Sequence, residues 1–130
     1  MPGTGPKAYA FNRTRKSFLA SELQLADTHW GRLRGLMGAS TTTFPFGSGL
    51  WIVPCHGVHT LGMRFPIDVI YLDENKVVVH IEENVRPWSL TPVHFDAATV
   101  MEVRWPTVIN TGTCIGDQVE IVGFNHRARA

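Results

Sequence analysis

Residues 67–83, IDVIYLDENKVVVHIEE, decide the fold class of this chain. Two runs rich in β-branched residues, 67–72 and 76–83, flank the short polar segment 73–75, and this arrangement is typical of a β-hairpin. In the first run both alternating faces are almost entirely apolar, so we expect that strand to be covered on both sides. The hairpin therefore predicts the buried centre of a β-rich domain.

The rest of the chain consists of short β-like runs separated by turn-forming residues. About six or seven strands and one or two short helices are expected, without the strand–helix alternation that builds parallel sheets. We therefore predict a mainly β fold, a single compact antiparallel β-barrel or sandwich with one or two short helices. The predicted strands outside the hairpin are 18–25, 50–54, 97–105 and 117–124, a helical turn is predicted at 106–112, and a single β-domain over 13–124 is predicted between flexible tails at 1–12 and 125–130.

The segment DTHWGRLRGLMG predicts a helix over residues 29–37. Either of the two residues that open the segment can cap the N-terminus, and Gly38 can end the helix. Trp30, Leu33 and Met37 recur at helical spacing. We therefore expect these three side chains to form one apolar stripe that is buried against the sheet.

The composition is that of a folded globule. The chain has 130 residues, of which 44% are hydrophobic and 18% are charged. Lys and Arg number 12 against 11 Asp and Glu, so we expect no nucleic-acid partner and no anionic membrane surface as partner. No apolar run is long enough for membrane insertion, and no secretory h-region opens the chain, so a cytoplasmic location is expected. Cys55 and Cys114 are expected to be reduced thiols.

A second stretch, CHGVHTLGMRFPID at residues 55–68, holds an unusual set of reactive side chains. Cys55, His56 and His59 are residue types that zinc uses as ligands. However, four residues of extended strand separate Cys55 and His59 by roughly 13 Å, and no second ligand pair occurs elsewhere. We therefore expect no metal and no cofactor. A nucleophilic Cys55 would need one of the histidines as a base, and a buried packing role is commoner for cysteine.

Asp68 is the polar residue of the buried strand. A carboxylate there must find hydrogen bonds or a cation, and Arg64, His59 and backbone amides are the candidates. Three interpretations stay open. The group is a structural polar knot at the strand entry, a ligand-binding rim of His59, Arg64 and Asp68, or the general base of an enzyme.

Four short pieces occur in the order RxxGLMG, HTxxMxxPID, NVRPW and GTxxGD. Together with their neighbours they resemble the domain-of-unknown-function family 192 over roughly residues 13–122. The resemblance implies a compact, single, mainly β domain with little helix, and it implies no particular reaction. The residues that it marks as candidates are Arg32, Gly35, Leu36, Met37, His59, Thr60, Met63, Pro66, Ile67, Asp68, Pro87, Trp88, Glu102, Gly112, Thr113, Gly116 and Asp117.

The leading hypothesis is a non-enzymatic β-domain that binds an unidentified small molecule or protein partner. The expected cleft lies near His59, Arg64, Asp68 and Trp88, and Glu102 is a further ligand-binding candidate. One alternative is a hydrolase-like enzyme that uses Asp68 or His59 as general base. The other is a structural domain with an internal polar cluster. The sequence assigns no catalytic residue and no oligomeric state.

Overall fold

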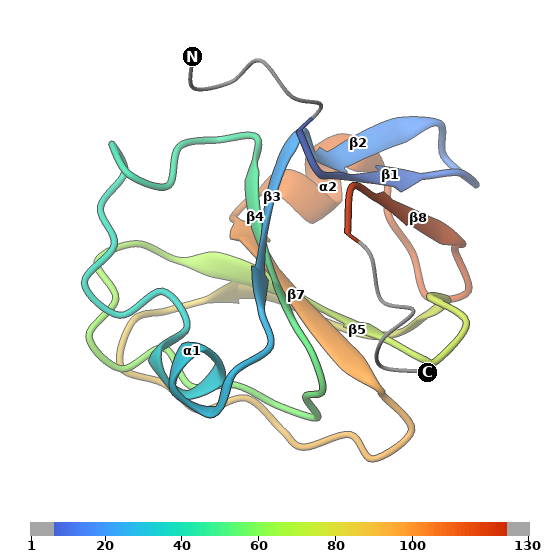
Figure 1. Ribbon diagram of the computed structural model, residues 1–130. Coiled ribbons are helices and arrows are strands. Elements are labelled where there is room, and N and C mark those ends of the chain that lie inside the picture. Colours follow the sequence, from blue (N-terminus) through green and yellow to red (C-terminus); the bar gives the residue numbers. More distant parts are fainter. Residues whose placement is uncertain (1–6, 125–130) are drawn as a thin grey trace.

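The computed structural model describes residues 7–124, which form two β-sheets and two short helices (Figure 1). The sheets do not close into a barrel, so the predicted mainly β class is confirmed in its sandwich-like form. The strand order is β2-β1-β8 in the three-stranded sheet and β3-β4-β7-β5-β6 in the five-stranded sheet. The elements are β1 (Tyr9–Asn12), β2 (Ser17–Ala20), β3 (Glu22–Ala26), α1 (His29–Arg34), β4 (Ser48–Ile52), β5 (Ile67–Leu72), β6 (Val78–Val85), β7 (Thr99–Arg104), α2 (Thr107–Thr111) and β8 (Val119–Val122).

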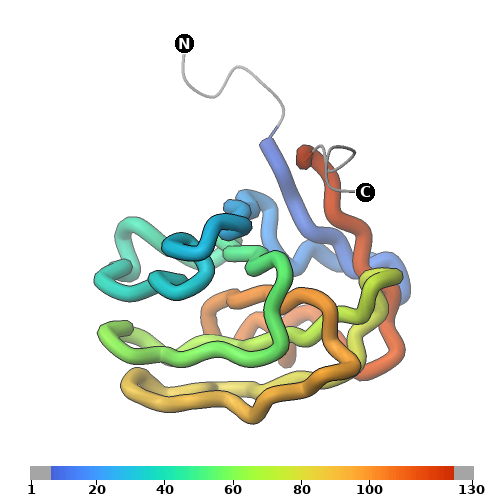
Figure 2. The backbone as a smooth tube through the Cα atoms, turned by 60° about the horizontal axis from the view of Figure 1, so that its bottom comes forward, coloured from blue at the N-terminus to red at the C-terminus, as the bar shows by residue number. Residues whose placement is uncertain are grey.

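The first strand lies inside the segment that was expected to be a tail. β1 is the central strand of its sheet, and it pairs with β2 on one side and with β8 on the other. Figure 2 shows these two ends of the described chain running next to each other, β1 in blue and β8 in red. Strand pairing thus begins N-terminal to residue 13, at which the sequence predicted the start of the domain. The remainder of both predicted tails, 1–6 and 125–130, lies outside the described residues.

The predicted hairpin of residues 67–83 is confirmed. β5 and β6 pair antiparallel, and all six residues of β5 are buried. Ile70 and Leu72 pack in the core cluster that includes residues of β1, β2 and β8, whereas Val69 and Tyr71 pack in a second cluster on the opposite face of β5. β5 is therefore covered on both sides, as its apolar faces predicted.

The predicted strand 18–25 is in fact two strands in different sheets. The chain bends at Ser21, where the backbone N–H groups of Ser21 and Glu22 both donate to the carbonyl oxygen of Gly47, at 2.9 and 3.1 Å. After this bend β3 pairs in parallel with β4, and α1 lies in the connection between them. The described strands are thus antiparallel except at this edge of the larger sheet.

The buried stripe predicted for the first helix is wrong. The helix ends early because Gly35 adopts a φ of +50°, so the helical spacing of the apolar residues is not continued. Trp30 and Leu33 are 69% and 60% exposed, and Met37 is 39% exposed. Only Leu36, just beyond the helix, is buried, at 6% exposure. Neither α1 nor α2 has the length and apolar composition that a membrane span requires.

We expect Leu36→Ala to lower the free energy of unfolding by about 2–3 kcal/mol, at the low end for a buried leucine. Leu33→Ala should change it by no more than about 0.5 kcal/mol, because that side chain is largely in water. Urea unfolding of the two variants measures the difference. An equal cost at both positions would mean that the turn after Gly35 continues as helix.

Candidate functional site

A cavity of about 570 Å³ lies between α1, the end of β4 and two loops. Its size falls within the usual range for small-molecule sites. The two loops, 53–59 and 86–98, pack closely, since a Cβ at Gly57 would lie 3.0 Å from the carbonyl oxygen of Pro92. Six apolar side chains line the cavity, and seven polar side chains converge on it from several elements. The apolar lining includes Leu33, Ile52, Pro54, Val58, Leu90 and Val93, and the polar lining includes His29, Arg32, Cys55, His56, His59, Thr91 and Glu102.

Glu102 is the buried acid of this cavity. It lies on β7, only 1% exposed, and its Oε1 atom has no hydrogen-bond partner among the described residues. Burial raises the pKa of Glu102 to about 8, so the side chain is a neutral carboxylic acid at neutral pH. The end of α1 lies over it, since a Cβ at Gly35 would be 3.6 Å from Oε1. The cavity therefore contains a carboxyl group that can both donate and accept a hydrogen bond.

His59 connects the 53–59 loop to the end of α1. Its Nε2 lies 2.7 Å from the carbonyl oxygen of Leu33, and its Nδ1 lies 3.2 Å from the backbone nitrogen of Leu61. A carbonyl only accepts and an amide only donates, so His59 is the neutral tautomer with its proton on Nε2. Both ring nitrogens are thus engaged, and neither is free to act as a base.

Cys55 and His56 also direct their polar atoms to backbone carbonyls. The Cys55 thiol donates to the carbonyl oxygen of Gly57 at 3.1 Å, and His56 Nδ1 donates to that of Ala97 at 2.7 Å. Burial is the main cause of a raised pKa at Cys55, which disfavours the thiolate that a nucleophile requires. The ligand atoms of Cys55, His56 and His59 do not form one of the metal-ligand groups found among residues 7–124.

Arg32 supplies the cationic group of the cavity. Its Nη1 donates to the carbonyl oxygen of Asp27 at 3.2 Å, and its Nη2 lies 3.2 Å from His29 Nδ1. The sequence marked Arg32 only through the family motif, because nothing in its local pattern distinguishes it from other surface arginines. Reasoning from the sequence also missed the wall formed by 90–93, for which the proline-interrupted excursion was the only signal.

Asp68 lies on the other side of the sheet from Glu102. Asp68 pairs with Val103, and Val69 pairs with Glu102. Because side chains alternate between faces along a strand, this register directs the two carboxyl groups to opposite faces. Asp68 therefore does not line the cavity in which His59 and Glu102 meet.

Two backbone amides hold the Asp68 carboxyl group. Oδ1 accepts from the N–H of Asn84 at 3.0 Å, and Oδ2 accepts from the N–H of Val108 at 2.8 Å. Burial nevertheless raises the pKa of Asp68, because desolvation outweighs these two bonds. Arg64 is exposed and Trp88 is 70% exposed, and neither lines the cavity. Of the five ligand-binding candidates from the sequence, the structure thus brings only His59 and Glu102 together in the cavity.

The GTxxGD motif forms a polar cluster away from the cavity. Oδ2 of Asp117 accepts from Asn12 Nδ2 at 3.0 Å, from Arg15 Nε at 2.9 Å and from the Cys114 N–H at 2.9 Å. Burial opposes ionisation of Asp117, but the hydrogen bonds from Arg15 and Asn12 outweigh it and hold its pKa below the ordinary value. The motif therefore fastens the turn after β1 to the turn before β8.

Fold and cavity together define a class, namely small two-sheet β domains with a small-molecule-sized cavity beneath a short helix. Within that class the chain belongs to the DUF192 family, described as "Uncharacterized ACR", whose sequence profile matches residues 10–121. This membership confirms the resemblance carried by the four motifs.

Known relatives agree with this assignment. The chain is 26% identical over 114 residues to a "UPF0127 protein" of Thermococcus sibiricus (strain DSM 12597 / MM 739), covering 84% of this chain and 71% of the relative. A protein of unknown function from Novosphingobium aromaticivorans DSM 12444 superposes with a TM-score of 0.73 at 20% identity, covering 92% of this chain and 89% of the other. A "putative transcription regulator" from Sinorhizobium meliloti 1021 gives 0.76 at 22% identity, covering 90% and 93%. At these identities the two structures establish the fold alone.

Proposed function

We propose that this domain binds a small organic molecule in the cavity beneath α1. The polar head of the ligand hydrogen-bonds to the Glu102 carboxyl group, and its apolar body packs against Leu33, Ile52, Val58 and Val93. The observation that carries the proposal is the buried Oε1 of Glu102, which has no hydrogen-bond partner among residues 7–124.

An unpaired buried oxygen is costly, typically by about 1–3 kcal/mol. Native proteins pair more than about nine in ten buried polar groups, so such an atom needs a reason. A ligand that occupies the cavity supplies the missing partner. Since a neutral carboxyl group both donates and accepts, the complementary head is one that also does both, such as a carboxamide.

The hydrolase alternative receives less support from the same geometry. A general base needs a free lone pair within reach of the reacting proton. His59 uses both ring nitrogens in backbone contacts, and Asp68 accepts two amides on the opposite face of the sheet. Binding without chemical conversion therefore agrees better with the state of these two residues.

The head-group class is tested with three small probes, namely benzamide, benzoate and benzylamine. We expect benzamide to bind best, and to shift the backbone amide signals of residues 55–59 and 90–93 in a two-dimensional NMR titration. Glu102→Met should weaken benzamide binding by about tenfold or more, because each lost buried hydrogen bond to the ligand contributes about 1 kcal/mol and leaves its partner unpaired. Trp88→Ala is the control and should bind benzamide unchanged, because Trp88 lies outside the cavity.

Two results would contradict the proposal. One is the absence of shifts in 55–59 and 90–93 with all three probes at millimolar concentration. The other is a set of shifts centred on Trp88 that Trp88→Ala removes, which would return the site to the surface first predicted from the sequence. A preference for benzylamine would mean that Glu102 ionises in the complex and that the head is a cation.

A further inference from the structure

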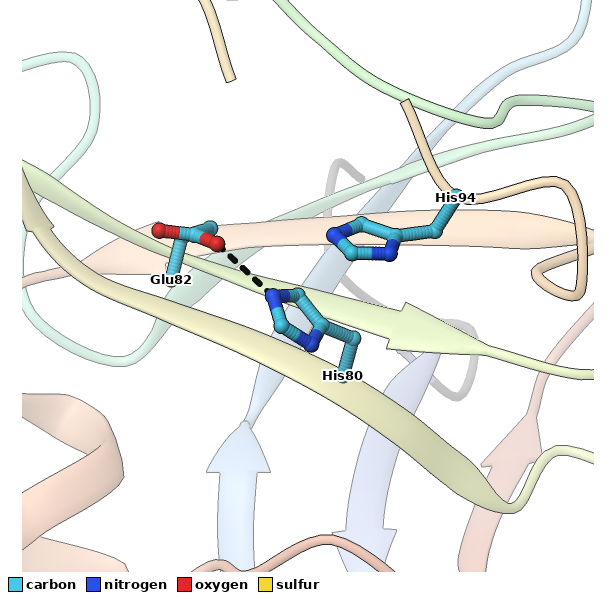
Figure 3. A group of neighbouring side chains, drawn as sticks. All are labelled: His80, Glu82 and His94. Carbon is cyan, nitrogen blue, oxygen red and sulfur yellow. Dashed lines mark hydrogen bonds and ion pairs between the residues drawn. The ribbon is translucent and has the colours of Figure 1, made fainter. Parts of the chain in front are cut away.

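Three side chains of metal-ligating types meet at the edge strand β6 of the larger sheet, and none of them lines the proposed pocket. His80 and Glu82 are two residues apart on β6, so their side chains leave the same face of that strand. His94 approaches them from the 86–98 loop, and Figure 3 shows the three side chains directed toward one another. The ligand atoms of this trio all lie within 4.8 Å of one another.

The trio is incompletely paired in its present state. His80 Nε2 lies 2.7 Å from Glu82 Oε2. His94 Nε2, in contrast, is buried and has no hydrogen-bond partner within the described part of the chain. The two imidazole rings lie close together, with centroids 3.7 Å apart. The buried Nε2 atom of His94 therefore lies beside the His80–Glu82 pair but has no hydrogen-bond partner among residues 7–124.

Tyr71 packs against both imidazole rings. The buried Tyr71 ring forms T-shaped contacts with His80 and His94, at centroid distances of 5.3 and 4.7 Å. Tyr71 is itself held by its hydroxyl, which donates to the carbonyl oxygen of Pro92 at 2.8 Å. The backbone N–H of His94 donates to the carbonyl oxygen of His56 at 2.9 Å. The site is thus built on a strand and on a fastened loop, as precise ligand sites require.

We propose that His80, Glu82 and His94 bind a divalent transition-metal ion of the zinc class. Two imidazole nitrogens and one carboxylate oxygen form a donor set that zinc uses, with a fourth position open to water. Imidazole ligands favour zinc, copper, nickel or iron over calcium and magnesium, which prefer oxygen. The ion gives the unpaired nitrogen of His94 a partner.

Small side-chain movements suffice to close the site around an ion. Zinc holds its ligands at about 2.0–2.2 Å, so tetrahedral ligand atoms are separated by about 3.3 Å. The His80–Glu82 contact of 2.7 Å must widen, and His94 must move slightly inward. Both His80 and Glu82 have side chains that are 31% exposed, so their torsions are free to adjust.

This site differs from the metal hypothesis weighed on the sequence. That hypothesis concerned Cys55, His56 and His59, whose polar atoms bind separate carbonyls. The new trio combines a His-x-Glu pair on β6 with a histidine from the 86–98 loop that follows this strand. The expectation that the chain binds no metal is therefore replaced, for this trio, by a proposal that can be measured.

The test is zinc titration of tag-free protein by isothermal titration calorimetry. We expect one Zn²⁺ bound per chain, a raised melting temperature in excess Zn²⁺, and a visible Co²⁺ spectrum typical of four-coordinate nitrogen and oxygen ligation. Glu82→Gln keeps the size and a hydrogen bond to His80 but removes the anionic ligand, and it should weaken zinc binding by about 10–100-fold or more. His94→Ala should abolish it.

Two matched controls define the location. His29→Ala removes an exposed histidine of α1, and Cys55→Ser removes the thiol of the earlier hypothesis, so both should bind zinc as the wild type does. The proposal is overturned if wild-type protein takes up no stoichiometric zinc, or if Glu82→Gln binds zinc with unchanged affinity. It is also overturned if Cys55→Ser loses the ion. Because Glu82 is partly exposed, Glu82→Gln decides the matter even if His94→Ala fails to fold.

Discussion

The free energy of unfolding should fall by about 1.4 kcal/mol for each pH unit between about pH 5 and about pH 8. Glu102 causes this fall, because burial raises the pKa of its carboxyl group from 4.5 in the unfolded chain to about 8 in the folded protein. Between these two values the native state binds one more proton than the unfolded state. The contribution of Glu102 to the free energy of unfolding is therefore greatest below about pH 4.5. It decreases by about 5 kcal/mol in total as the pH rises to about 8.

Two other carboxyl groups also have shifted pKa values. The pKa of Asp68 is also raised, by burial, so its contribution declines as the pH rises above its ordinary value near 3.8. The pKa of Asp117 is lowered below 3.8, because its hydrogen bonds outweigh the effect of burial, so its stabilisation is lost only as the pH falls further. The slope above about pH 5 therefore belongs mainly to Glu102.

Glu102→Gln isolates this contribution. The amide keeps the shape of the acid but has no proton to lose, so the variant should show a nearly flat stability between about pH 5 and about pH 8. Glu74→Gln is the matched control, since Glu74 is exposed in the hairpin turn and should leave the slope intact. Urea unfolding at a series of pH values measures all three proteins. An unchanged slope in Glu102→Gln would show that water solvates the acid and ionises it normally, which would also weaken the case for a ligand head at Glu102.

The elements that the sequence predicted correctly are those defined by neighbouring residues. The hairpin of β5 and β6 follows from two apolar runs and a polar turn. The helical turn α2 follows from Pro106 at its start and Gly112 at its end, and Gly112 indeed adopts a left-handed φ of +72°. Thr28, one of the two residues predicted to cap α1, does accept the N–H of Gly31. Such features are local, so a single segment contains the whole physical reason for them.

The errors concern long-range geometry. The helical spacing of Trp30 and Leu33 suggested a buried face. However, the helix ends at the positive φ of Gly35, and both side chains are exposed. The cavity joins α1, residues 52–59, residues 90–93 and a single acid on β7. Which strand faces meet depends on the register between β5 and β7, and no segment of the sequence contains that register.

The burial of Asp68 could be predicted from its own segment, but its hydrogen-bond partners could not. Its place in a strand covered on both faces predicted a buried carboxylate that needs partners, and the structure confirms the burial. The sequence left three kinds of partner open, namely Arg64, His59 and backbone amides. The amides that bind it belong to Asn84 at the end of β6 and Val108 at the start of α2, neither of which is near Asp68 in sequence. The polar-knot interpretation thus agrees with the geometry, and stability measurements can test it.

Asp68→Asn should lower the free energy of unfolding by about 3–5 kcal/mol. Each of the two carboxylate oxygens accepts a different amide, Oδ1 from Asn84 and Oδ2 from Val108. The asparagine side chain has only one acceptor oxygen, so its NH₂ group must face one of the two backbone N–H donors. That donor loses its bond and meets a second donor, so either α2 or the end of β6 loses its attachment to β5.

Asp73→Asn is the matched control, because Asp73 also accepts two backbone amides. Both of them, from Asn75 and Val77, bind the same atom, Oδ1, at 2.9 Å. An asparagine can therefore keep both bonds, and the turn is open to water, so this variant should lose no more than about 1 kcal/mol. Comparing the urea midpoints of the two variants tests the difference in hydrogen-bond geometry rather than the loss of charge. If Asp68→Asn were as stable as Asp73→Asn yet failed to bind benzamide, Asp68 would serve the ligand and not the fold. If only Asp68→Asn unfolds readily, the two hydrogen bonds of the Asp68 carboxyl group hold α2 and the end of β6 against β5.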